Sequence, residues 1–277
     1  MLSELADVVP IDDPHLGHHL GVWRPIPLAW ATAEEPPDLT TLTELKREIP
    51  DYFFSDRYRD RWLPALRNLV ATRFDAQAQE LAGEREVSEP MVVVKEPGSH
   101  VADLLFDLFP ESRLVWLLRD GRDVVDSWVD AYSRDSWAVE GGAFPLAPEG
   151  RPHLVRWLAS VWVYRTEVVQ ESFERHPPSR RVVIRYEDLR ADPARELERV
   201  CSVLDLNAGT RRLREIADAH AYERVADSDK GSGKVVRAAN PGGWRASMSA
   251  EEQRAMLEIM GPKLAELRYL AGTAAAA

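Results

Sequence analysis

The densest group of residues able to bind an anion lies near the middle of the chain, in the segment Leu117–Trp128. An apolar run ends at Arg119, Gly121 allows a turn, and Asp120 can cap the helix that we expect to follow. Arg119 would then lie at the carboxyl end of a strand, where open α/β sheets bind ligands, and Ser127 would lie two turns into the helix. An arginine and a hydroxyl can together hold a phosphate, although a surface arginine beside helix-capping aspartates fits the same spacing.

Two other apolar runs also end in residues that can do chemistry. Lys95 follows Met91–Val94, where it can neutralise charge on a transferring anionic group or extend into solvent from the sheet edge. Tyr186 comes shortly after Arg181–Ile184 and opens the run Tyr-Glu-Asp-Leu. If the strands are parallel, these ends meet at one edge of the sheet.

Basic residues gather again towards the C-terminus. Arg237 and Arg245 flank a glycine-containing turn that Trp244 can anchor, just before the last helix. The irregular stretch from Ala221 to Pro241 has the composition of a flap that covers a phosphate. Within it, Lys230–Lys234 resembles a Walker loop, but no apolar strand precedes it and no Ser or Thr follows the lysine, so we reject it as a phosphate loop.

The elements that must position these residues are strands alternating with helices. Continuously apolar runs are typical of strands buried on both faces of a parallel sheet, and we expect three of them, at Met91–Val94, Leu114–Leu118 and Arg181–Ile184. Three helices carry clear signals: 3.6-residue periodicity from His153 to Arg175, the Asp192-Pro193 start, and the capping box Ser249–Glu252. The sequence therefore predicts an α/β fold.

Two segments should depart from this regular alternation. We expect Gly261-Pro262 to interrupt the last helix. The stretch from Ser136 to Pro152 is rich in Gly and Pro, and its length suggests a lid or a segment that contacts substrate.

Composition excludes several classes of protein. The chain has 277 residues and a formal net charge of −11, which argues against general nucleic-acid binding. No apolar run approaches the roughly 20 residues needed to span a bilayer, and the first residues lack the basic start and cleavage site of a signal peptide. The single cysteine, Cys201, excludes a disulfide framework and fits a reducing cytoplasm.

Taken together, these runs resemble the sulfotransferase family that uses 3′-phosphoadenosine 5′-phosphosulfate (PAPS). The resemblance extends from about Lys95 to Leu267 and implies a P-loop-NTPase-like parallel sheet flanked by helices, a sulfotransferase fold, in a single domain over residues 1–277. The residues that match the family's positions are the strand-end lysine Lys95, the pattern Arg119, Asp123, Val124 and Ser127, the adenine-contact position Tyr186, and the C-terminal pattern Arg237, Gly242, Trp244 and Arg245, in which Ala239 stands where the family has its first glycine.

One expected part of that family is missing from the sequence. Its 5′-phosphosulfate loop, of the form Arg-Ser-Gly-Thr-Thr-Trp, does not occur, and Met1–Leu5 reads like the end of the helix that should follow it. We therefore expect that the chain begins after this loop, at an internal methionine or a truncated boundary. Because the strand that feeds the loop is central in this family, we predict a gap or a solvent-open slot in the middle of the sheet.

Sulfuryl transfer also needs a base that takes the acceptor's proton. The resemblance implies an acidic or histidine residue after the loop's helix, and Asp13 matches this position with His15 as its competitor. Glu96 and His100, near Lys95, rank second. The histidines of this region with Asp12 and Asp13 could alternatively bind zinc, although their spacing is not typical of a zinc site.

The resulting expectation is a cytoplasmic, metal-independent sulfotransferase. It would transfer the sulfuryl group of PAPS to a hydroxyl or amine of a small-molecule, glycan or lipid acceptor, near Trp23, Trp30 and Tyr52–Phe54. A P-loop kinase-like phosphotransferase and an inactive remnant of a sulfotransferase stay as alternatives.

Overall fold

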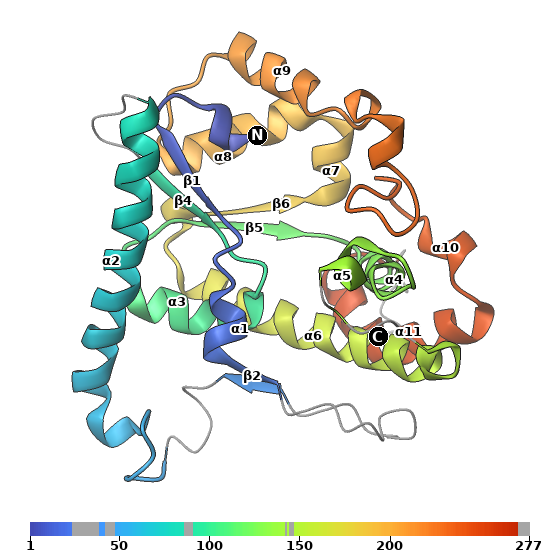
Figure 1. The fold of residues 1–277 in the computed structure, drawn as a ribbon, viewed down its shortest axis with the longest axis horizontal. Coiled ribbons are helices and arrows are strands. Elements are labelled where there is room, and N and C mark those ends of the chain that lie inside the picture. The colour runs from blue at the N-terminus through green and yellow to red at the C-terminus, as the bar shows by residue number, and fades with distance from the viewer. Residues whose placement is uncertain (24–38, 42–47, 86–90, 142, 144–146, 271–277) are drawn as a thin grey trace, which may run out of the picture.

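The structure, a computed structural model, describes residues 1–23, 39–41, 48–85, 91–141, 143 and 147–270. Two pairs of parallel strands lie in the middle of the molecule with helices around them, as Figure 1 shows. In that view α8 (Pro193–Leu204) and α9 (Thr210–Ala219) lie above the strands, α2 (Arg59–Arg85) lies to the left, and α6 (Arg151–Arg175) lies below. The α/β fold with parallel strands flanked by helices agrees with the sequence.

The first pair joins β1 (Val8–Asp12) to β4 (Met91–Lys95), and the second joins β5 (Leu114–Leu118) to β6 (Arg181–Arg185). The three strands expected from the sequence are thus confirmed. Strand β1 was not expected. Its proline interrupts the apolar run, but Pro10 is tolerated because β1 pairs only with β4 among the described strands, and an edge strand can spare one N–H. A small antiparallel pair, β2 (Gly21–Trp23) and β3 (Leu39–Thr41), lies apart.

The other helices complete the alternation. They are α1 (Leu16–Leu20), α3 (Ala102–Leu108), α4 (Gly121–Ala131), α5 (Trp137–Glu140), α7 (Tyr186–Ala191), α10 (Trp244–Ser247) and α11 (Ala250–Glu266), with 3₁₀ turns at Leu2–Glu4, Asp56–Tyr58, Ser99–Val101, Pro148–Gly150, Pro178–Arg180, Tyr222–Arg224 and Asp227–Asp229. The helix end expected at the N-terminus is only the first of these 3₁₀ turns, and the segment from Ser136 to Pro152 is not all loop, because it contains α5, a 3₁₀ turn and the start of α6.

The expected caps are present, and one expected break is not. Asp192 accepts a hydrogen bond from the backbone N–H of Arg195, and Ser249 forms a full capping box with Glu252. The expectation that Gly261-Pro262 interrupts the last helix was wrong, because α11 continues through Pro262 to Glu266. A proline removes only one backbone hydrogen bond, and the buried face of the helix, with Leu264 fully buried beyond the proline, holds its last turn in place.

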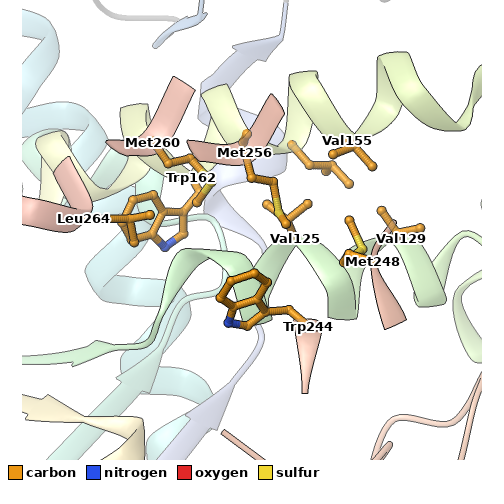
Figure 2. Packing of buried hydrophobic residues seen from close by; sticks show 11 residues of the cluster. Val125, Val129, Val155, Trp162, Trp244, Met248, Met256, Met260 and Leu264 are labelled. Carbon is orange, nitrogen blue, oxygen red and sulfur yellow. The ribbon is translucent and has the colours of Figure 1, made fainter. Parts of the chain in front are cut away.

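The main hydrophobic core lies where α4, α6 and α11 meet. Val125, Trp162, Met256 and Met260 come from these three helices and pack together in Figure 2. Gly121 makes this approach possible, since a Cβ there would lie 2.5 Å from the Trp162 ring and still closer to Met260. Gly121, which the sequence suggested would allow a turn, is instead the first residue of α4; packing requires a glycine there, and it brings the start of α4 against the core.

The two parallel pairs are separate within the described part of the chain, since no ladder of hydrogen bonds joins β4 to β5. Alternate side chains on both strands are open to solvent: Val92 and Val94 on β4 are 37% and 36% exposed, and Val115 and Leu117 on β5 are 37% and 56% exposed. Parallel sheets normally have both faces covered. These side chains of β4 and β5 are thus partly open to solvent; that a strand is missing between the two pairs stays a prediction.

We predict that Gly121→Ala destabilises the protein by about 1–3 kcal/mol, because the added methyl overpacks the core against Trp162 and Met260. The measurement is the free energy of unfolding in urea. Gly83→Ala is the matched control. Gly83 is an exposed residue of α2 with open space around its Cα, so there the same change should stabilise by about 0.5–1 kcal/mol. Equal effects at the two sites would contradict the packing role of Gly121.

Candidate functional site

The carboxyl ends of β1 and β4 bring a lysine and an aspartate into contact. Asp12 pairs with Lys95 in the parallel register, so Asp13 follows directly beside the lysine. Both carboxylate oxygens of Asp13 lie 2.9 Å from Nζ of Lys95, and the backbone N–H of Asp13 donates to the Lys95 carbonyl. Both side chains are partly exposed, at 41% and 64%. The pair can therefore reach a ligand at this edge of the sheet.

The turn that carries Asp13 is strained. Asp13 and His15 both have left-handed backbone conformations, with φ of 50° and 54°, on either side of Pro14. Residues other than glycine adopt this conformation at a cost, and such positions cluster at functional sites. The surrounding structure therefore imposes this backbone conformation, which these two residues would not favour by themselves.

Glu96 and His100 hold the same region together through backbone groups. The Glu96 carboxylate accepts hydrogen bonds from the N–H groups of Leu16, Gly17 and Gly98. The His100 ring is buried, and its Nε2 atom lies 2.9 Å from the carbonyl oxygen of Gly17. These contacts fix α1 against the turn after β4. They give both side chains a positioning role, which leaves Asp13 as the acidic candidate that is open to solvent.

At the carboxyl ends of β5 and β6 the structure brings Arg119 and Tyr186 together. The Arg119 guanidinium stacks over the Tyr186 ring, 4.5 Å from its centre. Nε of Arg119 is buried and has no hydrogen-bond partner, and the Ser127 hydroxyl makes no hydrogen bond to any described residue. A buried donor without a partner is costly, and an anionic oxygen at this place would satisfy it.

Four polar side chains fix the turn between β5 and α4. Asp120 caps α4 through the N–H of Arg122 and binds the Arg122 side chain with both oxygens. Glu187 accepts hydrogen bonds from the N–H of Asp120 and from the hydroxyl of Tyr269. Burial, together with the Glu187 charge, raises the pKa of Tyr269 well above its usual value, so this hydroxyl stays a donor. The position of Arg119 is thus set by a rigid turn.

The C-terminal pattern divides into one tryptophan in the core and two arginines at its edge. Trp244 is buried in the main core, with the guanidinium groups of Arg122 and Arg245 on its ring at 4.4 and 4.6 Å (Figure 2 shows Trp244). Arg237 forms an ion pair with Asp126 of α4. Asp126 immediately precedes Ser127, so Arg237 is held beside the helix that carries the serine.

Two residues of this region were missed by the sequence analysis. Asp126 shows no spacing signal, since its partner lies 111 residues away. Arg165, on α6, has its guanidinium over the Trp128 ring at 5.3 Å and donates to the Pro97 carbonyl at 3.5 Å. Burial lowers its pKa to about 10, although the charges of Tyr132 and Glu96 act in the opposite direction. Arg165 therefore joins α4 to the turn after Lys95.

The suggested acceptor aromatics are only partly described. Trp30 lies outside the described residues, and of Trp23 only the backbone, in β2, is described. Phe54 packs edge-on against Trp62 with ring centres 5.3 Å apart, whereas Phe53 is 78% exposed. Phe54 thus belongs to the packing around the start of α2.

Two kinds of site are absent from the described residues. Among the described residues, no three His, Cys, Asp or Glu side chains lie close enough to share a metal ion. In the same part of the chain, no helix has both the length and the apolar character needed to cross a bilayer.

Comparison with known proteins points to one family. The model of the sulfotransferase family matches residues 8–209. Similar solved structures include a mouse sulfotransferase complexed with PAP (16% identity, TM-score 0.49, covering 68% of this chain and 70% of that chain) and the sulfotransferase domain from the curacin biosynthetic pathway (15%, 0.46, 98% and 92%). A third is sulfotransferase STF9 from Mycobacterium avium (16%, 0.44, 69% and 44%). At these TM-scores the structural likeness adds no weight to the family match. No curated protein matches the chain.

Two substitutions on α4 should distinguish a residue that stabilises the fold from a residue whose side chain is free to bind a ligand. The Asp123 carboxylate accepts hydrogen bonds from the N–H groups of Gly242 and Trp244, so Asp123→Ala should cost about 2–3 kcal/mol of unfolding free energy. Ser127→Ala should change it by less than about 0.5 kcal/mol, because no described contact is lost. Urea denaturation measures both. A large loss in Ser127→Ala would mean that the hydroxyl has a structural role.

Proposed function

We propose, because the chain belongs to the sulfotransferase family, that it binds PAPS and transfers the sulfuryl group to a hydroxyl or amine of a small-molecule, glycan or lipid acceptor. In this proposal the adenosine and 3′-phosphate are bound at the ends of β5 and β6. The reacting group lies towards the ends of β1 and β4. Adenosine 3′,5′-bisphosphate is the product left behind.

The observation that carries the proposal is the unused hydrogen-bonding capacity around Arg119. Its buried Nε has no partner, and Ser127 on the following helix has a hydroxyl without a described partner. With Arg237 fixed beside the same helix, two guanidinium groups and one hydroxyl are available for a doubly charged phosphate. We assign the 3′-phosphate to these three residues.

We assign the adenine to Tyr186. One face of its ring stacks on the planar Arg119 guanidinium. Adenine, which is also planar, can stack on the other face or take the place of the guanidinium. Trp244 and Arg245 shape the turn that closes this end of the site, and we propose that they contact the nucleotide at its edge.

The reacting end is assigned to Lys95 and to Asp13, with His15 as the competing base. As the acceptor oxygen or nitrogen forms its bond to sulfur, the bond between sulfur and the phosphate oxygen breaks. The acceptor's proton passes to the Asp13 carboxylate, and Lys95 stabilises the negative charge on the departing bisphosphate. The contact between the two side chains supports this assignment, because it holds a base and a cation at one reacting group.

We further propose that these 277 residues lack the unit that binds the 5′-phosphosulfate. No Arg-Ser-Gly-Thr-Thr-Trp run occurs in the sequence, and the free edges of β4 and β5 with their exposed valines and leucine suit one more parallel strand and a covering helix. Such a strand–loop–helix unit would complete the parallel sheet of a single domain. Backbone N–H groups at a helix N-terminus would then hold the 5′ end.

A cytoplasmic location is part of the proposal. Cys201 is the only cysteine, and it is buried. Burial raises the pKa of its thiol, which keeps it in the unreactive form suited to a reducing compartment.

Three adenosine nucleotides test the binding assignment by titration calorimetry. We expect adenosine 3′,5′-bisphosphate and adenosine 3′-monophosphate to bind this chain within about threefold of each other, since the 5′ site is incomplete. Adenosine 5′-monophosphate should bind about 30-fold more weakly, because it leaves Arg119, Ser127 and Arg237 without their phosphate.

Ser127→Ala is the matched variant, since it should fold normally and lose part of the preference for the 3′-phosphate. Equal binding of all three nucleotides would contradict the assignment. A strong preference for the 5′-phosphate would show that a complete 5′ site is present.

The base is tested by activity with labelled PAPS and a panel of phenol, sugar, lipid and peptide acceptors. We expect Asp13→Asn, in the protein carrying the 5′ unit, to lower kcat by about 10²–10⁴-fold with the affinity for adenosine 3′,5′-bisphosphate unchanged. His15→Asn is the control, with a smaller loss expected. The reverse order would assign the base to His15.

A further inference from the structure

Helix α4 carries three carboxylates on one face, and each binds a different part of the C-terminal segment 232–247. Asp123, Asp126 and Asp130 are spaced so that they line one side of the helix. Asp130 accepts hydrogen bonds from the hydroxyl of Ser232 and the N–H of Gly233. Segment 232–247, which includes the buried Trp244, is thus held against α4 by the side chains of these three aspartates.

The middle carboxylate differs from the other two because it binds a cation. Asp126 is 4% exposed, forms an ion pair with Nη2 of Arg237 through Oδ2, and accepts the Ser247 hydroxyl at 2.7 Å through Oδ1. The hydrogen bond to Asp126 raises the pKa of Arg237 further, although burial acts against it, and the charges of Asp126, Asp130 and Asp123 add to the effect. The guanidinium is therefore permanently charged and held from one side.

We propose that Asp126 is a positioning residue that orients Arg237 for the 3′-phosphate of the nucleotide, an inference that rests on the function proposed above. A guanidinium has five N–H donors in a fixed plane. The described ion pair uses one nitrogen of Arg237, so the remaining donors can form the paired contact that a phosphate prefers.

The carboxylate could instead compete with the phosphate, and the geometry decides between the two. Asp126 is itself held by Ser247 and buried in α4, so it cannot follow the arginine away from the helix. A free arginine loses its side-chain freedom when it binds an anion, whereas Arg237 has already lost it. We therefore expect the gain from fixing the side chain beforehand to exceed the repulsion between the carboxylate and the phosphate, which would contact the guanidinium from different sides.

The test measures how much more weakly adenosine 5′-monophosphate binds than adenosine 3′,5′-bisphosphate, as a ratio of dissociation constants. We expect Asp126→Asn to lower this ratio about five- to tenfold while leaving the binding of the 5′-monophosphate unchanged. Asp130→Asn is the matched control. It removes a carboxylate of the same helix that binds the same segment but not Arg237, so the ratio should stay as in the wild type. In an Arg237→Ala background, Asp126→Asn should have no further effect.

A ratio unchanged or increased in Asp126→Asn would overturn the inference while leaving the proposed function intact. An equal fall of the ratio in Asp130→Asn would overturn it as well. Any contact that holds segment 232–247 against α4 would then have the same effect, without a specific role for Asp126. A wild type that does not discriminate between the nucleotides contradicts the proposed function itself and removes the ligand role of the pair.

A second measurement needs no nucleotide. The Nη2–H signals of Arg237 in NMR should exchange slowly in the wild type and in Asp130→Asn, and quickly in Asp126→Asn. Fast exchange in the wild type would overturn the ordering of Arg237. If Asp126→Asn fails to fold, Ser247→Ala keeps the ion pair but removes the second contact of Asp126, together with the hydrogen bond from the hydroxyl to the Gly243 carbonyl, and should lower the nucleotide ratio about twofold. An unchanged ratio in a folded Ser247→Ala protein, together with fast exchange of Arg237, would count against the proposal.

Discussion

The parallel register of the two strand pairs is the constraint on which the site depends. Leu118 pairs with Arg185, so the next residues of both strands, Arg119 and Tyr186, leave the sheet at the same edge and stack. The pairing of Asp12 with Lys95 does the same for Asp13 and the lysine. Because parallel strands end together, residues far apart in the sequence become neighbours without any long-range signal of their own.

The sequence was most informative where a short-range pattern has one physical cause. Continuous apolar runs predicted β4, β5 and β6, and capping residues predicted the starts of α8 and α11. Strand β1 was missed because Pro10 is costly in a central strand but tolerated at an edge, and only the fold shows which strand is the edge. The ion pair between Asp126 and Arg237 could not be predicted either, because the sequence around an aspartate on a helix does not show whether its partner is water or a half-buried arginine.

An acidic protein can organise a site for an anion if each cation is held in place. The net charge is −11, yet the basic side chains of the candidate site are not all used up in ion pairs with neighbouring carboxylates. Lys95 and Arg237 each have one fixed carboxylate partner, whereas Arg119 is held by the Tyr186 ring and keeps its buried Nε unused. Stacking costs a guanidinium none of its in-plane donors, so Arg119 has the largest capacity left for a ligand.

The separation of the two strand pairs has a consequence for how such a site works. One half-site, at β5 and β6, is assembled by the turn around Asp120 and by α4, and the other, at β1 and β4, by the Glu96 contacts with α1. Although β4 and β5 share no ladder of hydrogen bonds among the described residues, Arg165 joins α4 to the turn after Lys95, and Val93 packs against the cluster that contains Val182 and Ile184. The distance between the two halves is therefore set by packing and not by the sheet. In the function that we propose, recognition of the nucleoside needs only the half-site at β5 and β6, whereas transfer also requires the reacting atoms to be held within about 3–3.5 Å of each other. In the same proposal, a further strand between the two pairs would set that distance through the sheet itself, so this strand would be required for catalysis but not for binding of the 3′ end.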